Sequence, residues 1–116
     1  MRDMRYAQHN ELVNKTLLFL SANHLGTYWS NPTGALLSSS GHFQRYGLKG
    51  SSDIIGISNS GIFVGIEIKT GKAVQSAPQK NFQRMVEKQK GLYIVVRSVE
   101  EFDMLKEKLI QYVLLA

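Results

Sequence analysis

The chain has 116 residues, of which 43% are apolar and 20% charged, and this composition is typical of one soluble globular domain. The formal net charge of +5 favours a polyanionic partner, and the absence of cysteine excludes disulfides and thiolate metal sites. The start, MRDMRYAQHNE, is too polar for a secretory signal, and no apolar run reaches the ~18 residues of a membrane span. We therefore expect a single domain over residues 1–116 and a cytoplasmic location.

The first predicted element is a helix over residues 4–23, because its apolar side chains recur at helical spacing: Leu12, Val13, Leu17 and Leu20. Glu11 lies at the edge of this apolar stripe. Glu11 is either a solvated helix glutamate or, if the fold brings it near Asp53, an additional acid of a functional site. His9, like His24 and His42, is expected to face solvent, because the histidine spacing matches no zinc pattern.

A strand is predicted at residues 27–29, and the residues after it lose all periodicity. We expect residues 34–50 to form a loop. Phe43, Arg45 and Tyr46 give this segment a basic and aromatic character, which suits contact with phosphates and stacking on bases. The alternative is a surface loop whose two aromatic rings fold back on the core.

The next predicted feature is a pair of strands, one headed by Asp53 and one carrying Glu67 and Lys69. The connection at 58–61 is short and contains Asn and Gly, which favours an antiparallel hairpin. Because side chains alternate along a strand, Glu67 and Lys69 point to the same face. Gly65, within the second strand, indicates a bulge or a close contact.

Buried charges are costly unless they are paired or bind a metal, so an acid and an amine on an otherwise apolar strand need a reason. With Asp53 beside them, Glu67 and Lys69 suit a divalent metal and a phosphodiester. The structural alternatives are an aspartate that caps a turn and a salt bridge between Glu67 and Lys69 on an exposed face.

A second helix is predicted from Ser76 to about residue 90, with Pro78 in its first turn. Gln79 falls three residues after Ser76, which predicts a capping box, and this structural role competes with a catalytic role for Gln79. The helix is expected to direct three apolar side chains inward: Phe82, Met85 and Val86.

The end of the chain is predicted to be a buried strand at 92–96 and a helix that begins near Val99. Ser98 and Glu101 have the spacing of another capping box. The last residues, 109–116, are very apolar, so they either complete the core or pack against a second chain.

The predicted order of elements, with D…ExK on the central strands, resembles the PD-(D/E)XK nuclease superfamily. Three segments, GLKGSSDIIGI, GIEIKTGKAVQSAPQKNF and GLYIVVRSVEEF, resemble the virus-type replication-repair nuclease (VRR-NUC) family. The resemblance covers the chain from Glu11 to about Phe102. It implies an α/β fold (an α+β mixed sheet) with a restriction-endonuclease-like core, in which helices flank a central mixed β-sheet. Ser52 departs from the proline of the superfamily name.

The resemblance also implies a set of site residues. Asp53 and Glu67, with the backbone carbonyl of Ile68, would hold Mg²⁺, for which Mn²⁺ can substitute. Lys69 would position or activate water. Gln79 would lie close to the site, and Glu11 would be a further acid of the site.

Together these features predict a metal-dependent, structure-selective DNA endonuclease that cuts branched DNA such as Holliday junctions. The family includes small standalone phage proteins, which implies a homodimer acting in a bacterial or phage-infected cell. Our candidates for phosphate contacts are Arg45, Lys49 and Lys72. Two alternatives remain open: a nucleic-acid-binding module without catalytic activity, and a sequence-specific nuclease of the restriction type.

Overall fold

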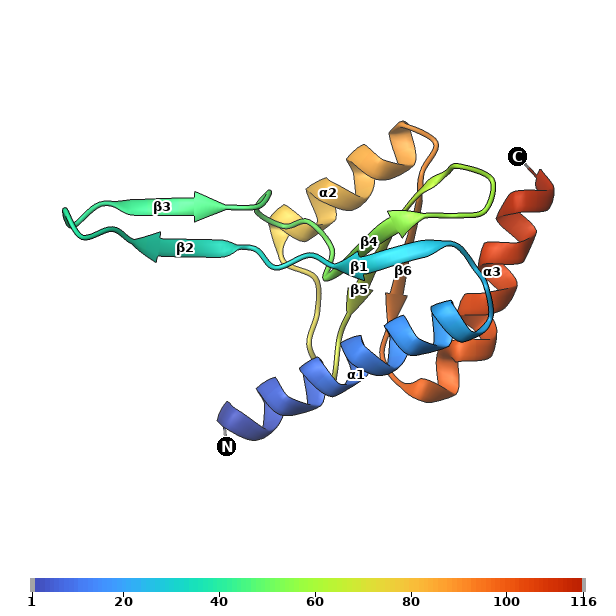
Figure 1. Cartoon of the computed structure of the whole chain (residues 1–116), viewed down its shortest axis with the longest axis horizontal. Coiled ribbons are helices and arrows are strands. Elements are labelled where there is room, and N and C mark those ends of the chain that lie inside the picture. Colours follow the sequence, from blue (N-terminus) through green and yellow to red (C-terminus); the bar gives the residue numbers. More distant parts are fainter. Residues whose placement is uncertain (1, 116) are drawn as a thin grey trace.

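The structure is a computed structural model that describes residues 2–115, with side chains described at 6–34 and 36–112. Its helices and strands follow in the order α1 (Arg2–Ala22), β1 (Thr27–Ser30), β2 (Gly34–Leu37), β3 (Phe43–Tyr46), β4 (Ile54–Ile57), β5 (Phe63–Ile68), α2 (Ala77–Lys88), β6 (Leu92–Val96), the 3₁₀ turn η1 (Val99–Glu101) and α3 (Phe102–Leu115) (Figure 1). None of the helices in this described part is long and apolar enough to span a membrane.

The main sheet has four strands in the order β1-β4-β5-β6. Strands β1, β4 and β5 are antiparallel neighbours, and β6 runs parallel to β5. The hairpin predicted around Asp53 and Glu67 is therefore confirmed as β4–β5. A parallel pair needs a long crossover, and α2 supplies it between β5 and β6. The fold is thus mixed α/β, with a mixed-orientation sheet flanked by helices, as predicted at this coarse level.

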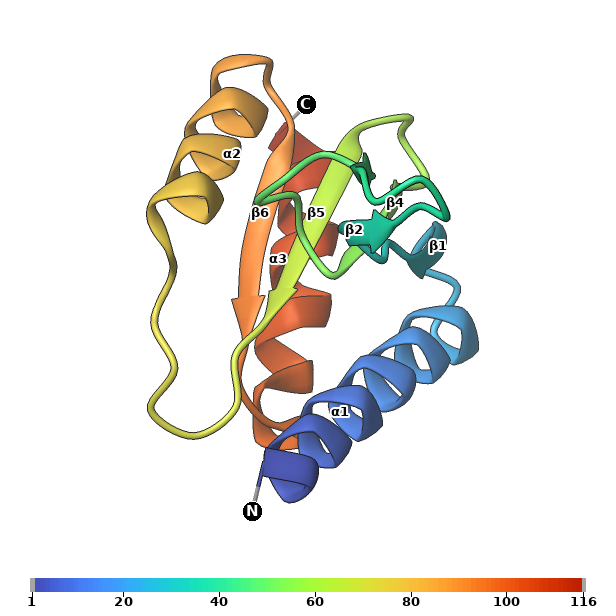
Figure 2. The ribbon, with the colours of Figure 1, turned by 90° about the vertical axis from the view of Figure 1, so that its left-hand side faces the viewer.

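The sheet is covered on both faces, with α1 and α3 on one side and α2 on the other (Figure 2). The larger core lies under α1 and α3 and includes the buried side chains Leu12, Leu20, Ile54, Val64, Ile66, Ile68, Ile94, Val96, Leu105 and Leu109. The smaller core lies under α2 and contains Phe82, Val86 and Tyr93. Because β5 alternates its side chains, its isoleucines enter the larger core and Glu67 faces the α2 side.

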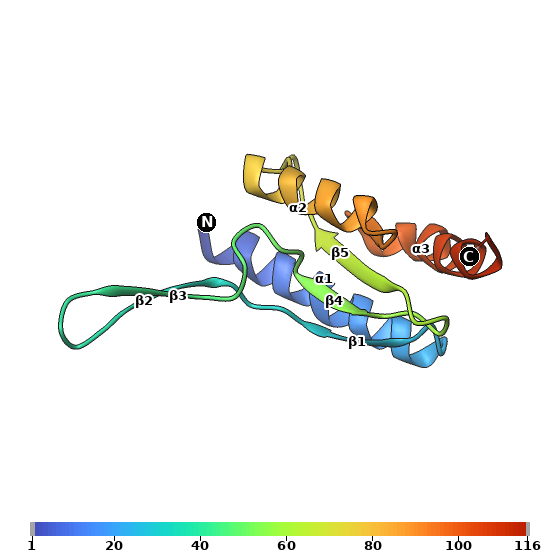
Figure 3. The ribbon, with the colours of Figure 1, turned by 90° about the horizontal axis from the view of Figure 1, so that it is seen from above.

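A second, two-stranded sheet, β2–β3, lies where we predicted a loop. We call this hairpin the arm. It extends away from the main sheet, and the longest dimension of the molecule is 51 Å, against 32 Å and 23 Å in the other directions (Figures 1 and 3). Hydrophobic periodicity does not indicate a strand here, because every side chain of β3 is exposed and this strand lacks the alternation that a buried face imposes.

Two predicted helix details differ in the structure. Met85 is 42% exposed rather than inward, whereas Phe82 and Val86 are buried as expected. The capping box of Ser98 and Glu101 does not form, because a 3₁₀ turn precedes α3 and displaces the start of the helix. The apolar C-terminus is buried at Leu109, whereas the side chains of its last residues, 113–116, lie outside the described residues.

Candidate functional site

Asp53 immediately precedes β4, at the end of the main sheet where β5 finishes. Its carboxylate Oδ2 accepts a hydrogen bond of 2.8 Å from the backbone N–H of Ile68, which fixes the carboxylate against the end of β5. Its backbone carbonyl accepts from the N–H of Asn31 at 2.7 Å. The side-chain amide of Asn31 also donates to Ser51 Oγ at 2.7 Å and to the Ser52 carbonyl at 2.9 Å. Asn31 thus holds the chain from Ser51 to Asp53 through both its backbone and its side chain.

Glu67 is buried on β5, with only 2% of the residue exposed. Its Oε2 accepts a hydrogen bond from Gln79 Nε2 at 2.9 Å and lies 3.5 Å from Lys69 Nζ. Its Oε1 is buried and has no hydrogen-bond partner in the described part of the molecule. A buried carboxylate oxygen without a partner is costly, and a bound cation would remove that cost.

The surroundings of Glu67 disfavour its negative charge. Burial, followed by the nearby charge of Asp53, raises the pKa of Glu67 to about 8, whereas Lys69 acts in the opposite direction. The lysine therefore offsets only part of the cost. A buried carboxylate beside a second carboxylate is an arrangement that a divalent cation could stabilise.

Gln79 has both of the roles that the sequence analysis treated as alternatives: it caps a helix, and it contacts the site residues. Its Oε1 accepts from the backbone N–H of Ser76 at 2.8 Å, and its own N–H donates to Ser76 Oγ at 3.3 Å, which completes the predicted capping box. The same Oε1 accepts from Lys69 Nζ at 2.8 Å, while Nε2 donates to Glu67. The cap of α2 therefore also positions the acid and the lysine.

His9 corrects one of our predictions, because it faces the site rather than solvent. Its Nε2 lies 3.3 Å from Asp53 Oδ2, and its side chain is only 31% exposed. The signal was present in the helix register: His9 comes four residues before Val13, which is buried, so both side chains lie on the same face of α1. His24 and His42 are exposed, as expected.

Glu11, the other candidate from α1, lies away from this group. Its carboxylate is 63% exposed and pairs with Lys15 at 2.7 Å, and the hydrogen bond from Lys15 lowers its pKa. Glu11 lines a shallow hollow with Val99, on a different face of α1 from His9. The structure thus brings His9, and not Glu11, to Asp53.

The basic candidates fall into two places. Arg45 and Lys49 line one small hollow of about 60 Å³ at the base of the arm. Lys72 is exposed in the loop between β5 and α2, and no hydrogen bond or ion pair of the described residues joins it to the other two.

Ser52 explains the glycine in β5. A Cβ built on Gly65 would lie 2.4 Å from Ser52 Oγ, so the predicted close contact is confirmed and any larger residue would force Ser52 to move. The hydroxyl of Ser52 is buried and, like Glu67 Oε1, has no hydrogen-bond partner among the described residues. The chain before Asp53 therefore packs directly on β5, which brings the two acid-bearing strands together.

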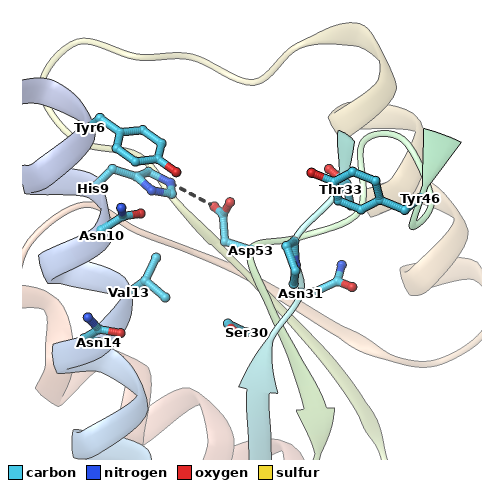
Figure 4. Close-up of a pocket in the computed structure, with 11 residues that line it drawn as sticks. Tyr6, His9, Asn10, Val13, Asn14, Ser30, Asn31, Thr33, Tyr46 and Asp53 are labelled. Atoms are coloured by element: carbon cyan, nitrogen blue, oxygen red, sulfur yellow. Dashed lines mark ion pairs between the residues drawn. The ribbon is translucent and has the colours of Figure 1, made fainter. Parts of the chain in front are cut away.

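An open cleft of about 530 Å³ adjoins Asp53, between α1 and the strand ends near the base of the arm (Figure 4). His9 and Asp53 meet at its wall. The cleft therefore lies on the α1 side of Asp53, whereas Gln79 approaches Glu67 from α2.

The donor set fits a hard cation with an incomplete protein shell. In the described side chains no three His, Cys, Asp or Glu residues are grouped to hold a metal ion. Asp53 and Glu67 are the residues that could hold Mg²⁺, which usually binds one or two carboxylates and keeps several waters. Comparison of the sequence with protein-family models and with curated proteins finds no match.

Proposed function

We propose that this protein is a metal-dependent, structure-selective DNA endonuclease with a PD-(D/E)XK core of the VRR-NUC type. The observation that carries the proposal is the group of Asp53, Glu67 and Lys69 at one end of the sheet. One oxygen of Glu67 in this group is buried and has no hydrogen-bond partner among the described residues, and the pKa of Glu67 is raised. The arrangement of a D…ExK hairpin between flanking helices supports the same assignment.

Asp53, Glu67 and the Ile68 carbonyl are the groups that would hold Mg²⁺ or Mn²⁺. When bound, the ion offsets negative charge on the phosphate and lowers the pKa of a water. The Ile68 N–H keeps the Asp53 carboxylate oriented through its 2.8 Å hydrogen bond. Gln79 keeps the Glu67 carboxylate oriented from the opposite side.

Lys69 is the residue that would contact the reacting phosphate or orient the attacking water. Its side chain is 11% exposed, so its charge is only weakly screened by solvent. Its Nζ is held 2.8 Å from Gln79 Oε1, which fixes a flexible side chain in one place. A fixed positive charge beside the scissile phosphate stabilises the charge that develops during hydrolysis.

DNA is the proposed substrate because the chain is basic, with a net charge of +5, and carries Arg45 and Lys49 together beside the arm. Such contacts give an affinity that falls steeply with salt. Lys72, in the exposed loop after Lys69, is the third proposed phosphate contact. Branched DNA is proposed because a homodimer would present two sites related by a two-fold axis to two strands.

The test is to incubate the protein with labelled four-way junction, flap and linear duplex DNA, each with Mg²⁺, Mn²⁺ or EDTA. We expect metal-dependent paired nicks in the junction, lost in Glu67→Ala. Glu107→Ala, which removes an exposed glutamate from α3, is the matched control and should cut as the wild type does.

Each other outcome changes the proposal in a defined way. Equal cutting of all three DNAs would keep the nuclease and remove the preference for branches. Cutting of linear duplex at one fixed sequence would favour a restriction-type enzyme. Binding without cutting under either metal would favour a binding module without catalytic activity.

A further inference from the structure

The side chains that line the cleft beside Asp53 differ in chemical character from the acid pair of Asp53 and Glu67. Its wall is made by one face of α1, the end of β1 with the residues that follow, and the base of the arm, and it includes Tyr6, His9, Asn10, Asn14, Tyr46 and Asp53 (Figure 4). The volume of about 530 Å³ is within the range of small-ligand pockets, roughly 300–1,000 Å³.

Among the described side chains, the lining holds no lysine or arginine, and Asp53 would repel an anion. These side chains suit a neutral group better than a phosphate. The polar groups are mainly neutral amides and hydroxyls. The amides of Asn10 and Asn14 make no hydrogen bond to other described residues, so their donors and acceptors are available to a ligand. Neutral donor and acceptor pairs of this kind match the edges of a nucleobase.

Two tyrosines lie on opposite sides of the cleft, Tyr6 on α1 and Tyr46 on β3 (Figure 4). Tyr6 is 70% exposed and Tyr46 is 43% exposed, so a ligand in the cleft can reach both rings. Tyr46 lies over Gly34, where an added Cβ would be 2.6 Å from the tyrosine hydroxyl oxygen. The glycine therefore makes room for this ring. Aromatic side chains beside a polar cleft are the usual means by which proteins stack unpaired bases.

We propose that this cleft binds an unpaired nucleobase of the DNA strand that is cut, adjacent to the scissile phosphate. The inference rests on the proposed nuclease function and specifies its substrate. Asp53 links the proposed cutting site to the cleft. Its carboxylate belongs to the acid pair and also to the wall of the cleft, where it contacts His9. A strand whose phosphate lies at Asp53 and Glu67 would thus present a neighbouring base to the tyrosines. A base inside a continuous duplex is stacked and paired and is not free to enter.

If the cleft holds an unpaired base, the affinity for a DNA substrate should depend on whether a base next to the cut is unpaired. Flaps, gaps and branch points that leave a nucleotide unpaired at the cut should bind more tightly than perfect duplex. The asparagines would select among bases through their hydrogen-bonding edges, and the tyrosines would hold any base by stacking.

The experiment uses 2-aminopurine, a base whose fluorescence falls when it stacks on an aromatic ring. It is placed either at the unpaired nucleotide of a flap or at the same position in continuous duplex, and the full-length protein is added in EDTA so that no cutting occurs. We expect quenching only with the flap. Tyr6→Leu and Tyr46→Leu should each weaken flap binding about tenfold and leave duplex binding unchanged. Phe63→Leu, an exposed aromatic residue at the other end of β5, is the control and should change neither.

A third variant, Asn14→Asp, guards against misfolding of the arm in Tyr46→Leu. Asn14 is exposed on α1, so the substitution places a charge in the cleft without removing core packing. It should also weaken flap binding. Unchanged flap affinity in all three cleft variants would overturn the inference. If the same variants still cut DNA in Mg²⁺, the nuclease function stands without it.

Free deoxyadenosine monophosphate distinguishes a base within a strand from a separate nucleotide. It should displace the flap only at concentrations far above those of the DNA, because it lacks the phosphates bound elsewhere. Displacement at equal concentration would overturn the proposal in favour of a nucleotide site.

Discussion

Glu67 is buried, and one of its carboxylate oxygens has no hydrogen-bond partner among the described residues. Its two charged neighbours shift its pKa in opposite directions, Asp53 upward and Lys69 downward. Its carboxyl group is therefore more easily protonated in the folded protein than in the unfolded chain. Such a group makes folding stability depend on pH, and the direction follows from proton binding. Between the ordinary pKa of 4.5 and the raised value of about 8, the folded state keeps a proton that the unfolded state releases. Stability should consequently fall as pH rises through this window.

We predict that Glu67→Gln removes this dependence. In EDTA, the wild type should lose unfolding free energy on the order of 3 kcal/mol between pH 5 and pH 8, and the variant should lose much less. Urea denaturation at several pH values measures the difference. Glu107→Gln, on the exposed side of α3, is the control and should follow the wild type. Parallel pH curves for the wild type and Glu67→Gln would contradict the raised pKa.

Some residues of the candidate site could be predicted from the sequence alone, and others could not. Asp53, Glu67 and Lys69 were accessible because strand alternation fixes which side chains share a face. His9 was missed because residue type was weighed without the register that links it to Val13. The location of Glu11 was not predictable, because it depends on how α1 is rotated about its axis when it packs on the sheet.

At the scale of elements, the side chain of Gln79 at the N-terminus of α2 both stabilises the helix and positions the residues of the site. Ser76 acts only in the cap, whereas Gln79 acts in the cap and on Glu67 and Lys69. Substitutions at these two positions should therefore separate stability from activity.

We predict that Ser76→Ala costs about 1 kcal/mol of unfolding free energy and leaves the cutting rate nearly unchanged. Gln79→Glu should do the reverse. A glutamate still completes a capping box, but it donates no hydrogen bond to Glu67 and places a third negative charge there. Urea unfolding and the initial rate of cleavage, measured on both variants, test the pair. A loss of cutting in Ser76→Ala equal to that in Gln79→Glu would show that Gln79 acts through the helix alone.

Elements with a buried face were predictable, whereas the arm was not. Strands β4, β5 and β6 were found because their apolar residues are dense, and the turn before β5 contains Asn and Gly. The arm has no core to impose a pattern. Its cross-strand partners, such as Leu37 and Phe43, meet without burial, so neither hydrophobic periodicity nor a turn motif reveals it.

At the scale of the whole molecule, the arm exposes large apolar side chains. Leu37 and Phe43 are paired across the two strands and are 62% and 77% exposed. An isolated two-stranded hairpin is marginally stable in water, and large exposed apolar side chains mark interaction surfaces. Since we propose a homodimer, a second copy of this chain is the partner we expect.

We predict that Phe43→Asp weakens the proposed homodimer. The new charge would be buried without a partner at the interface, which should raise the dissociation constant at least tenfold. Analytical ultracentrifugation without DNA measures this change. Val74→Asp alters an equally exposed apolar residue outside the arm and should leave the oligomeric state as it is. A wild-type protein that is monomeric at all concentrations would remove the dimer from the proposal.

The hydrogen bonds of Asn31 give the molecule a modular character. They connect the chain just before the arm to the chain just after it, at Ser51, Ser52 and Asp53. A change in the part of the arm beyond Arg45 and Tyr46 should therefore stop at this junction and leave Asp53 in place. Doubling the length of a flexible loop costs only about 0.6 kcal/mol of closure entropy. The outer part of the arm can therefore vary in length and sequence, and with it the partner that the arm contacts. The acids at its base keep their positions and their chemistry.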